Sequence, residues 1–429
     1  MNSTPLLAKL CTILLISSCS VYRDAPINLK EENTAWEKES HIPFHTSVSQ
    51  KQAILIGLIM NPELNKARLK LATSKEVAKQ AGWWNDPSFS WEIEKVLQEN
   101  IINLSGNLGL TIPVTGIPYL EKKVAEQYKE ADFWTLRQAE LDFLCSLDRA
   151  WNKLSITQRR KTLIQERLNS ISQENSQMKQ LLEAGEIDFS SWQIAMQRMN
   201  NATRELQTIT GAETEQQLEL IKLMGLHPST IKNLKFNINL GEQIPPAVLI
   251  PPPAELTKMP KIKAQLAIYA TTETQLKTEI RRQYPELELG PTFTRDDGEK
   301  EVGGDIGFNI PLWNRNRKAI SEARGSRNIA RQETIQLWKT ELTNAQRLNT
   351  IQQITFQQCN SELQRIKPLV EAIKTIEKLY NIGETSLAEL AENRHQLYEN
   401  RLTFLDKLDA LLSIQAQMRY LTHAPFQTK

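Results

Sequence analysis

The chain has 429 residues, and its 52 Lys and Arg against 50 Asp and Glu leave a formal net charge of only +2. This balance argues against a nucleic-acid-binding protein, which carries a basic excess. Gly contributes 16 residues, about half of its ordinary share of ~7%, and this composition favours long helices. The longest apolar run inside the chain, Ala53 to Met60, is far shorter than the ~20 residues of a membrane-spanning helix.

The N-terminus has the pattern of an export signal. Lys9 precedes a mostly apolar stretch, which ends in small residues before Cys19, as in secretory signal peptides. The run Ile16-Ser17-Ser18-Cys19 resembles a bacterial lipobox, so we expect a signal peptide at 1–18 and a lipidated Cys19 that carries palmitate. An ordinary signal peptide with an incidental cysteine is the alternative.

The next segment, 19–45, is expected to be a lipidated tether, because most of it is polar. Ser20, rather than Asp, follows the lipidated position. In bacterial lipoproteins that choice implies retention at the outer membrane, where acyl chains add membrane affinity.

The rest of the chain contains a duplication. Landmarks recur at a constant spacing of 198 positions: Pro62 and Pro260, Pro87 and Pro285, Gly109 and Gly307, Pro113 and Pro311, Gly185 and Gly383. Chance matches would scatter in spacing, so we predict two structural copies. The first copy spans 46–227 and the second 260–429. A proline-rich crossing segment at 228–259 separates them, because proline clusters continue neither helices nor central strands.

Each copy is predicted to contain a helix, two strands, a very long helix and a shorter helix, in that order. The strands are expected at about 87–97 and 103–113 in the first copy, and at about 285–294 and 302–312 in the second. Apolar residues alternate along them, in the sets Leu104, Gly106, Leu108, Leu110, Ile112 and Val302, Gly304, Ile306, Phe308, Ile310. Strands of about ten residues can cross a bilayer, and flanking Trp and Tyr side chains suit a membrane interface. Two soluble hairpins packed on helices are the alternative.

The long helices argue against a compact soluble domain, because each could reach roughly 105 Å. Together, the two shorter helices of a copy are nearly as long as its long helix, so we expect them to line it end to end. The long helices reverse at Gly185 and Gly383, where glycine permits a left-handed helix end. Asp188 and Ser386 can cap the helices that follow.

These features together resemble the TolC-type outer-membrane efflux family, from about His45 to the C-terminus. The resemblance rests on Asn61-Pro62-Glu63-Leu64, Asp86 to Ser90, Gly109 to Pro113, Gly185-Glu186, Ile310 to Asn316 and Tyr380 to Ser386. The strand pattern and the stretch Ile310-Pro311-Leu312-Trp313-Asn314-Arg315-Asn316 look most like the heavy-metal (cobalt–zinc–cadmium) efflux branch.

The resemblance implies a mainly α fold with transmembrane β: a homotrimer whose 12-stranded β-barrel is continued by a long periplasmic α-helical barrel. It implies a passive channel in the outer membrane that extends into the periplasm, without enzymatic activity or cofactor. The implied partners are outer-membrane lipid, a periplasmic adaptor protein and an inner-membrane pump of the resistance-nodulation-division type. The exported solutes would be metal cations or drugs.

The resemblance also assigns roles to the two reversals, which we call the helix tips. Adaptor docking is expected at Gly185, Glu186 and Asp188 in the first tip and at Gly383, Glu384 and Ser386 in the second. A pore gate is expected just past the second tip, at Glu389, Glu392 and Tyr380. The family's arginine two positions after the glycine is Thr385 here, which puts a salt-bridge lock at that position in doubt.

Other functions remain open at this stage. A type I protein-secretion duct would share the fold, and a periplasmic coiled-coil lipoprotein spacer would share the lipid anchor and the long helices. Enzymatic readings lack support, because the sequence has no HExxH, GxSxG, P-loop or GxGxxG motif. The five histidines are not clustered at metal-ligand spacing, and no metal site is expected from Cys145 and Cys359, which we predict to be free thiols.

Overall fold

The computed structural model describes residues 22–40, 47–96, 101–238, 243–296 and 299–421. Contacts divide the chain into two units, Met1–Phe44 and His45–Lys429. The predicted signal peptide and Cys19 lie outside the described residues. Within those residues, none of the helices combines the length and the apolar character needed to cross a membrane.

The segment predicted to be a tether contains a helix, α2 (Leu29–Ser40). The side chain of Asn28 accepts a hydrogen bond from the backbone N–H of Lys30 at 3.2 Å. Acidic residues in the first turn and Lys38 in the last turn complement the helix dipole. The hydrophobic pattern did not reveal this helix, because its local support is a cap and well-placed charges.

The second unit repeats one order of elements. The first copy contains α3 (Gln50–Met60), α4 (Pro62–Gln80), β2 (Ser88–Val96), β3 (Ile101–Ile112), α5 (Ile117–Glu183) and α6 (Phe189–Met224). The second contains α8 (Pro260–Arg281), β5 (Leu287–Asp296), β6 (Glu299–Gly307), α9 (Arg317–Asn381) and α10 (Leu387–Arg419). The starts of α4 and α8 are 198 positions apart, and so are those of α6 and α10.

Strand limits differ from the sequence prediction at both ends. β6 ends at Gly307, so Phe308 and Ile310, which were predicted to belong to the strand, lie beyond it. The pairing of β6 with β5 ends with Glu288 opposite Gly307, one residue after β5 begins. At the hairpin ends β3, β5 and β6 extend beyond their predicted limits, so Arg295 and Lys300, outside the predicted strands, belong to β5 and β6.

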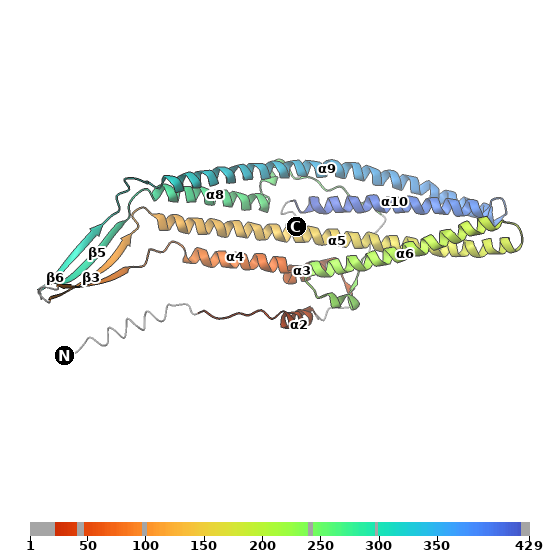
Figure 1. The fold of residues 1–429 in the computed structure, drawn as a ribbon. Coiled ribbons are helices and arrows are strands. Elements are labelled where there is room, and N and C mark those ends of the chain that lie inside the picture. The colour runs from red at the N-terminus through yellow and green to blue at the C-terminus, as the bar shows by residue number, and fades with distance from the viewer. Residues whose placement is uncertain (1–21, 41–46, 97–100, 239–242, 297–298, 422–429) are drawn as a thin grey trace. The chain divides into compact units, whose positions relative to one another are not determined.

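The four strands form one antiparallel sheet in the order β2-β3-β5-β6. The two hairpins are joined by pairing of β3 with β5, for example Gly106 opposite Phe293 and Leu110 opposite Leu289. The outer edges of β2 and β6 have no partner strand in this sheet. Figure 1 shows the strands at one end of the long helices and the helix tips at the other.

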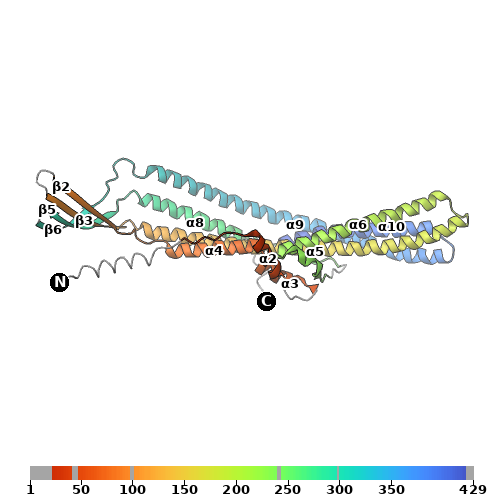
Figure 2. The ribbon, with the colours of Figure 1, turned by 60° about the horizontal axis from the view of Figure 1, so that its bottom comes forward.

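The helices pack as two sets. α4 and α6 lie in succession along α5, and α8 and α10 lie in succession along α9, as Figures 1 and 2 show. This confirms that two shorter helices line each long one. α5 also contacts α8 and α10, and an apolar core joins α5, α9 and α10 around Ile164, Cys359 and Leu408.

Between the copies lie the short helices η1 (Pro228–Lys232) and α7 (Pro253–Leu256) and the strand β4 (Lys235–Phe236), which pairs in parallel with β1 (Ser47–Val48). Glutamine side chains hold the proline-rich part. Gln352 of α9 bonds both the N–H and the C=O of Val248 at 2.9 Å. Gln415 of α10 donates to the C=O of Pro246 at 3.0 Å. These bonds satisfy backbone groups that prolines leave without a regular ladder.

Both described cysteines, Cys145 and Cys359, are free thiols, as predicted from the sequence. Burial raises the pKa of each to about 11. Both thiols are therefore protonated at neutral pH.

Candidate functional site

The register of the sheet separates the two kinds of charge. Pairing fixes which side chains share a face, because directly opposite residues point the same way. Every acidic residue of the four strands lies on one face, which we call the acidic face: Glu92, Glu94, Glu288, Asp296, Glu299, Glu301 and Asp305. Polar residues such as Asn107 and Thr292 share this face.

The opposite face, which we call the apolar face, holds the large hydrophobic side chains Phe89, Trp91, Ile93, Leu104, Leu108, Leu110, Leu289, Phe293, Val302 and Ile306. Several of them are open to the surroundings: Val302 is 82% exposed and Ile306 70%. A contiguous exposed apolar surface of this kind marks contact with lipid or with another protein.

The two helix tips have the same backbone geometry. At the first tip the N–H of Glu186 donates to Leu181 and the N–H of Gly185 donates to Leu182. The second tip repeats both bonds 198 positions later, from Glu384 to Leu379 and from Gly383 to Tyr380. Gly185 and Gly383 have φ of 76° and 79°, the left-handed conformation that closes a helix C-terminus.

The caps that start the next helices also match. The side chain of Asp188 accepts from the N–H of Ser191 at 3.0 Å, and that of Ser386 accepts from the N–H of Glu389 at 3.2 Å. Hydrogen bonds from Ser190 and Ser191 lower the pKa of Asp188 to about 2. The first tip therefore carries a carboxylate where the second carries a neutral hydroxyl.

The predicted gate residues lie beside the second tip, but they do not form one cluster. Glu389 and Glu392 are exposed one turn apart at the start of α10. Thr385, in the position where an arginine was expected, donates to Glu389 Oε2 at 2.6 Å. Glu392 pairs with Arg198 of α6 at 3.1 Å. Tyr380 bonds Gln177 of α5 at 3.5 Å instead.

A charged network near this tip joins the helices. Arg394 of α10 bonds Glu174 of α5 at 3.0 Å, Glu377 of α9 at 2.9 Å and Ser170 of α5 at 3.3 Å. Glu174 keeps only 12% of its side-chain exposure. Burial would lower the pKa of Arg394, but hydrogen bonds to Glu377 and Glu174 outweigh it and raise that pKa.

A second set of contacts surrounds Arg167 of α5. Its guanidinium donates to His395 Nδ1 at 3.2 Å and stacks over the Tyr398 ring, 4.1 Å from the ring centroid. Tyr398 donates to Glu205 of α6 at 2.6 Å. Burial, together with that bond, raises the pKa of Tyr398, so the phenol stays a donor. His395 is therefore held by arginine within the protein.

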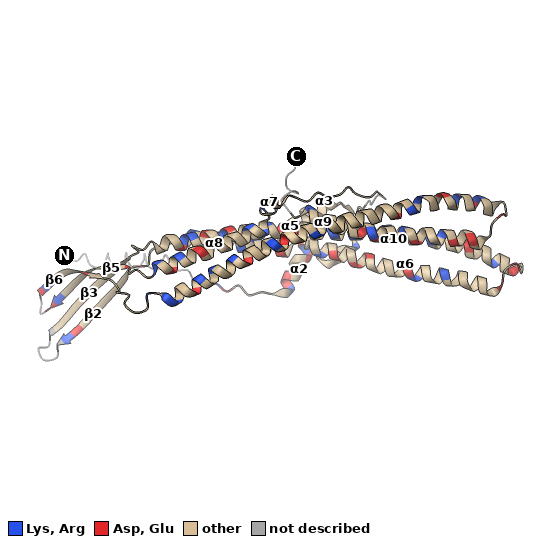
Figure 3. Ribbon diagram, turned by 90° about the horizontal axis from the view of Figure 1, so that it is seen from above, with Lys and Arg blue, Asp and Glu red and all other residues tan. Residues whose placement is uncertain are grey.

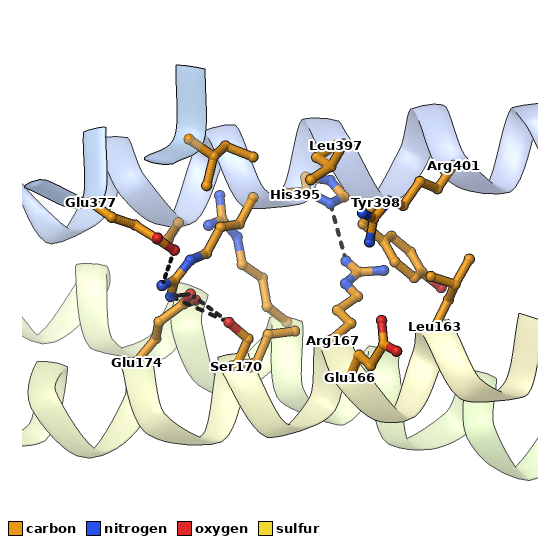
Figure 4. A pocket seen from close by; sticks show the side chains of 15 residues that line it. Leu163, Glu166, Arg167, Ser170, Glu174, Glu377, His395, Leu397, Tyr398 and Arg401 are labelled. Carbon is orange, nitrogen blue, oxygen red and sulfur yellow. Dashed lines mark hydrogen bonds and ion pairs between the residues drawn. The ribbon is translucent and has the colours of Figure 1, made fainter. Parts of the chain in front are cut away.

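The two sets line a cavity of about 300 Å³ between α5, α6, α9 and α10. Figure 4 shows Glu174, Glu377 and Ser170 converging from neighbouring helices on one guanidinium, and Arg167 reaching toward His395. Arg401 also lines this cavity. Within the described residues, no group of three or more His, Cys, Asp and Glu side chains could hold a metal ion.

The sequence analysis missed Arg167, Arg198 and Arg394. Helical spacing shows which residues share a face of one helix, but not which helix packs against that face. One signal was available for Arg394: it continues the buried series Leu387, Ala391 and Tyr398 at spacings of three and four. A charged residue in such a series predicts a buried ion pair.

No family model matches the chain, and no curated protein matches its sequence. Solved structures match over most of the chain. CusC, described for its transmembrane channel formation, has a TM-score of 0.74 and 13% identity, covering 94% of this chain and 95% of CusC. The outer membrane protein VceC of Vibrio cholerae has a TM-score of 0.73 and 16% identity, covering 87% of this chain and 95% of VceC.

The CmeC outer membrane channel of Campylobacter jejuni has a TM-score of 0.72 and 14% identity, covering 94% of this chain and 89% of CmeC. At these identities the likeness establishes the fold. The chain has the fold of these channel proteins.

Proposed function

We propose that this chain is the outer-membrane channel component of a tripartite efflux system, a passive conduit for small solutes. The observation that carries the proposal is the four-stranded sheet, with a continuous exposed apolar face and an acidic face behind it. Such a sheet suits a barrel wall with lipid outside and water inside. The fold shared with outer-membrane channels supports the same conclusion.

The proposal requires several copies of the chain. β2 and β6 leave backbone N–H and C=O groups unpaired at the edges of the sheet. In lipid such groups must be satisfied within the protein, so the sheet has to close with other copies. Three chains would form the 12-stranded barrel of the TolC-type architecture. Their long helices would continue it as an α-helical barrel into the periplasm.

The charges of the sheet favour cationic cargo. The acidic face would line the barrel, and it carries no Lys or Arg on the four strands. Such a lining attracts cations and repels anions. Metal cations of the cobalt–zinc–cadmium type and amine-bearing drugs both fit this lining, and the pump, of the resistance-nodulation-division type, would choose between them.

The helix tips would meet the periplasmic adaptor, which joins the channel to the pump. Gly185, Glu186 and Asp188 would dock at one tip, and Gly383, Glu384 and Ser386 at the other. Glu389 and Glu392 from three chains would form the acidic gate ring, with Tyr380 beside it. In the protomer Arg198 neutralises Glu392, so opening the gate would involve breaking this pair. Palmitate on Cys19 would anchor the chain at the outer membrane.

Planar-bilayer recording of the purified full chain tests the proposal. We expect stepwise conductance, a reversal potential that shows cation preference, and an oligomer that dissociates only on heating. A periplasmic spacer would give neither conductance nor a heat-modifiable oligomer, so that pair of results would contradict the proposal. Export of a polypeptide rather than small cations would favour the type I secretion alternative.

A further inference from the structure

Every basic residue of the four strands lies at the hairpin end of the apolar face. Arg295 and Lys300 are direct cross-strand partners in β5 and β6. Lys95 lies on the same face of β2, opposite Ile102 and one row closer to the hairpins. All three are exposed. Figure 3 shows blue segments near the hairpin ends of the strands, while most of the strand length is tan.

The pairing of Arg295 with Lys300 is unfavourable by itself. Residues directly opposite in an antiparallel pair have Cβ atoms about 4.5–5.5 Å apart, and like charges there are destabilising. The same row continues through Leu104 to Ile93, so its other members are apolar. Among the described residues, no ion pair is formed by any of the three cations.

The described acidic residues next to these cations in sequence lie on the opposite face of the sheet. Asp296 and Glu301 follow Arg295 and Lys300 in the chain, but successive side chains of a strand point to opposite faces. Both carboxylates therefore lie on the acidic face, behind the sheet. Within the described residues, the apolar face holds no carboxylate that could pair with the cations, and an anion from outside the chain can reach them on that side.

The position of the cluster indicates which anion. The apolar face extends from the row of Ile112 and Leu287 to the row of Leu104 and Arg295, about 27 Å along the strands. At a tilt of about 40° this is roughly 20 Å along the membrane normal, close to the ~25 Å apolar band of outer-membrane barrels. The cations thus lie at the boundary between the hydrocarbon core and the lipid headgroups, and long basic side chains can place their charge among the headgroups.

We propose that Lys95, Arg295 and Lys300 form a binding rim for the phosphate groups of anionic lipids in the leaflet on the hairpin side of the barrel. This rests on the proposed function, because it requires the apolar face to stand in lipid. A phosphate between Arg295 and Lys300 turns a repulsive pair into two charge-assisted contacts, one of them with the bidentate geometry of a guanidinium. Lys95, on the first hairpin, adds a third cation.

The double variant Arg295→Gln with Lys300→Gln tests the rim, because the two environments predict opposite effects. In a nonionic detergent the variant oligomer should dissociate at the same or a higher temperature than the wild type, since the repulsion is gone. In phosphatidylcholine vesicles with added phosphatidylglycerol, the wild type should gain thermal stability and the variant should lose most of that gain. Two cations near a membrane surface correspond to an affinity difference for the anionic lipid on the order of 30-fold.

The double variant Lys339→Gln with Arg347→Gln is the matched control. It removes the same charge from exposed positions of α9, away from the sheet, and should keep the full gain from phosphatidylglycerol. Equal gains in wild type and rim variant would overturn the proposal. A full gain from inorganic phosphate in detergent would overturn the assignment to lipid.

Conductance separates this proposal from the proposed function. The rim lies on the face opposite the carboxylates, so wild type and rim variant should conduct alike. If wild type and rim variant both conduct and gain equal stability from phosphatidylglycerol, the rim is rejected and the proposed function is kept. A wild type that neither inserts nor conducts would reject both.

Discussion

Replacing Arg394 with methionine should loosen the tip region by about 2 kcal/mol. Arg394 joins α10 to Glu174 of α5 and Glu377 of α9, and the substitution keeps the unbranched apolar stem of the side chain without its charge. Removing one partner of a buried pair costs about 3–5 kcal/mol, because the other charge stays buried. Arg394 retains 31% of its side-chain exposure and Glu377 42%, so water offsets part of that cost and about 2 kcal/mol remains.

Native-state hydrogen exchange measures this effect directly. Amides of α5 and α10 beside the network should exchange roughly 30-fold faster, while those near the sheet keep their rates. Arg401→Met is the control: Arg401 lies two turns further along α10 without an ion pair among the described residues, and its loss should change exchange little. Adding Glu174→Gln to Arg394→Met should recover part of the loss, because no buried charge is left. Equal exchange in the Arg394 and Arg401 variants would refute the reasoning.

Three further predictions concern the same end of the molecule. Gly383→Ala should destabilise the tip by about 1–2 kcal/mol through its left-handed backbone alone, since a Cβ there meets nothing within 4 Å. Gly325→Ala, inside α9 and equally open, should stabilise the helix by about 0.5–1 kcal/mol. Hydrogen exchange that changes in the same direction in both variants would contradict this. The pKa of Asp188 is depressed to about 2, so its cap stabilises α6 fully above the unfolded pKa of about 3.9, and this stabilisation is lost as pH falls through 2. Hydrogen exchange at the start of α6 should increase over that pH range. The start of α10, which is capped by a serine, should not respond. Glu389→Gln with Glu392→Gln should reduce cation preference and divalent block in single-channel records, and unchanged records would remove these residues from the gate.

The periodic parts of the architecture were predictable from the sequence. The spacing of 198 positions anticipated the repeated order of elements and the position of both tip glycines. The repeat extends to individual hydrogen bonds, because the same Gly-Glu pair closes both long helices. Alternation along β3 placed Leu104, Leu108 and Leu110 on one face, as the register shows.

What could not be predicted depends on contacts between elements. The end of β6 at Gly307 could not be read from the repeat, because β3 continues to Ile112 directly before Pro113, the counterpart of Pro311. The separation of acidic and basic residues appears only when β3 pairs with β5, since neither hairpin alone shows which of its faces matches the other's. The partners of Arg394 lie on two other helices, more than 15 positions away in sequence.

Disulfide trapping across the open sheet edges tests most directly whether this sheet closes with other copies in the membrane. In a variant without Cys145 and Cys359, Ser90→Cys in β2 would be combined in turn with cysteine at Glu301, Gly303 or Asp305 in β6. Within one chain Ser90 and Gly303 share a row at opposite edges, three strand spacings or about 14 Å apart, beyond the ~7 Å limit for a disulfide. We predict that one register forms a covalent ladder in membranes that stops at three chains. No trapped species at any register, or a ladder that continues past three chains, would contradict the account.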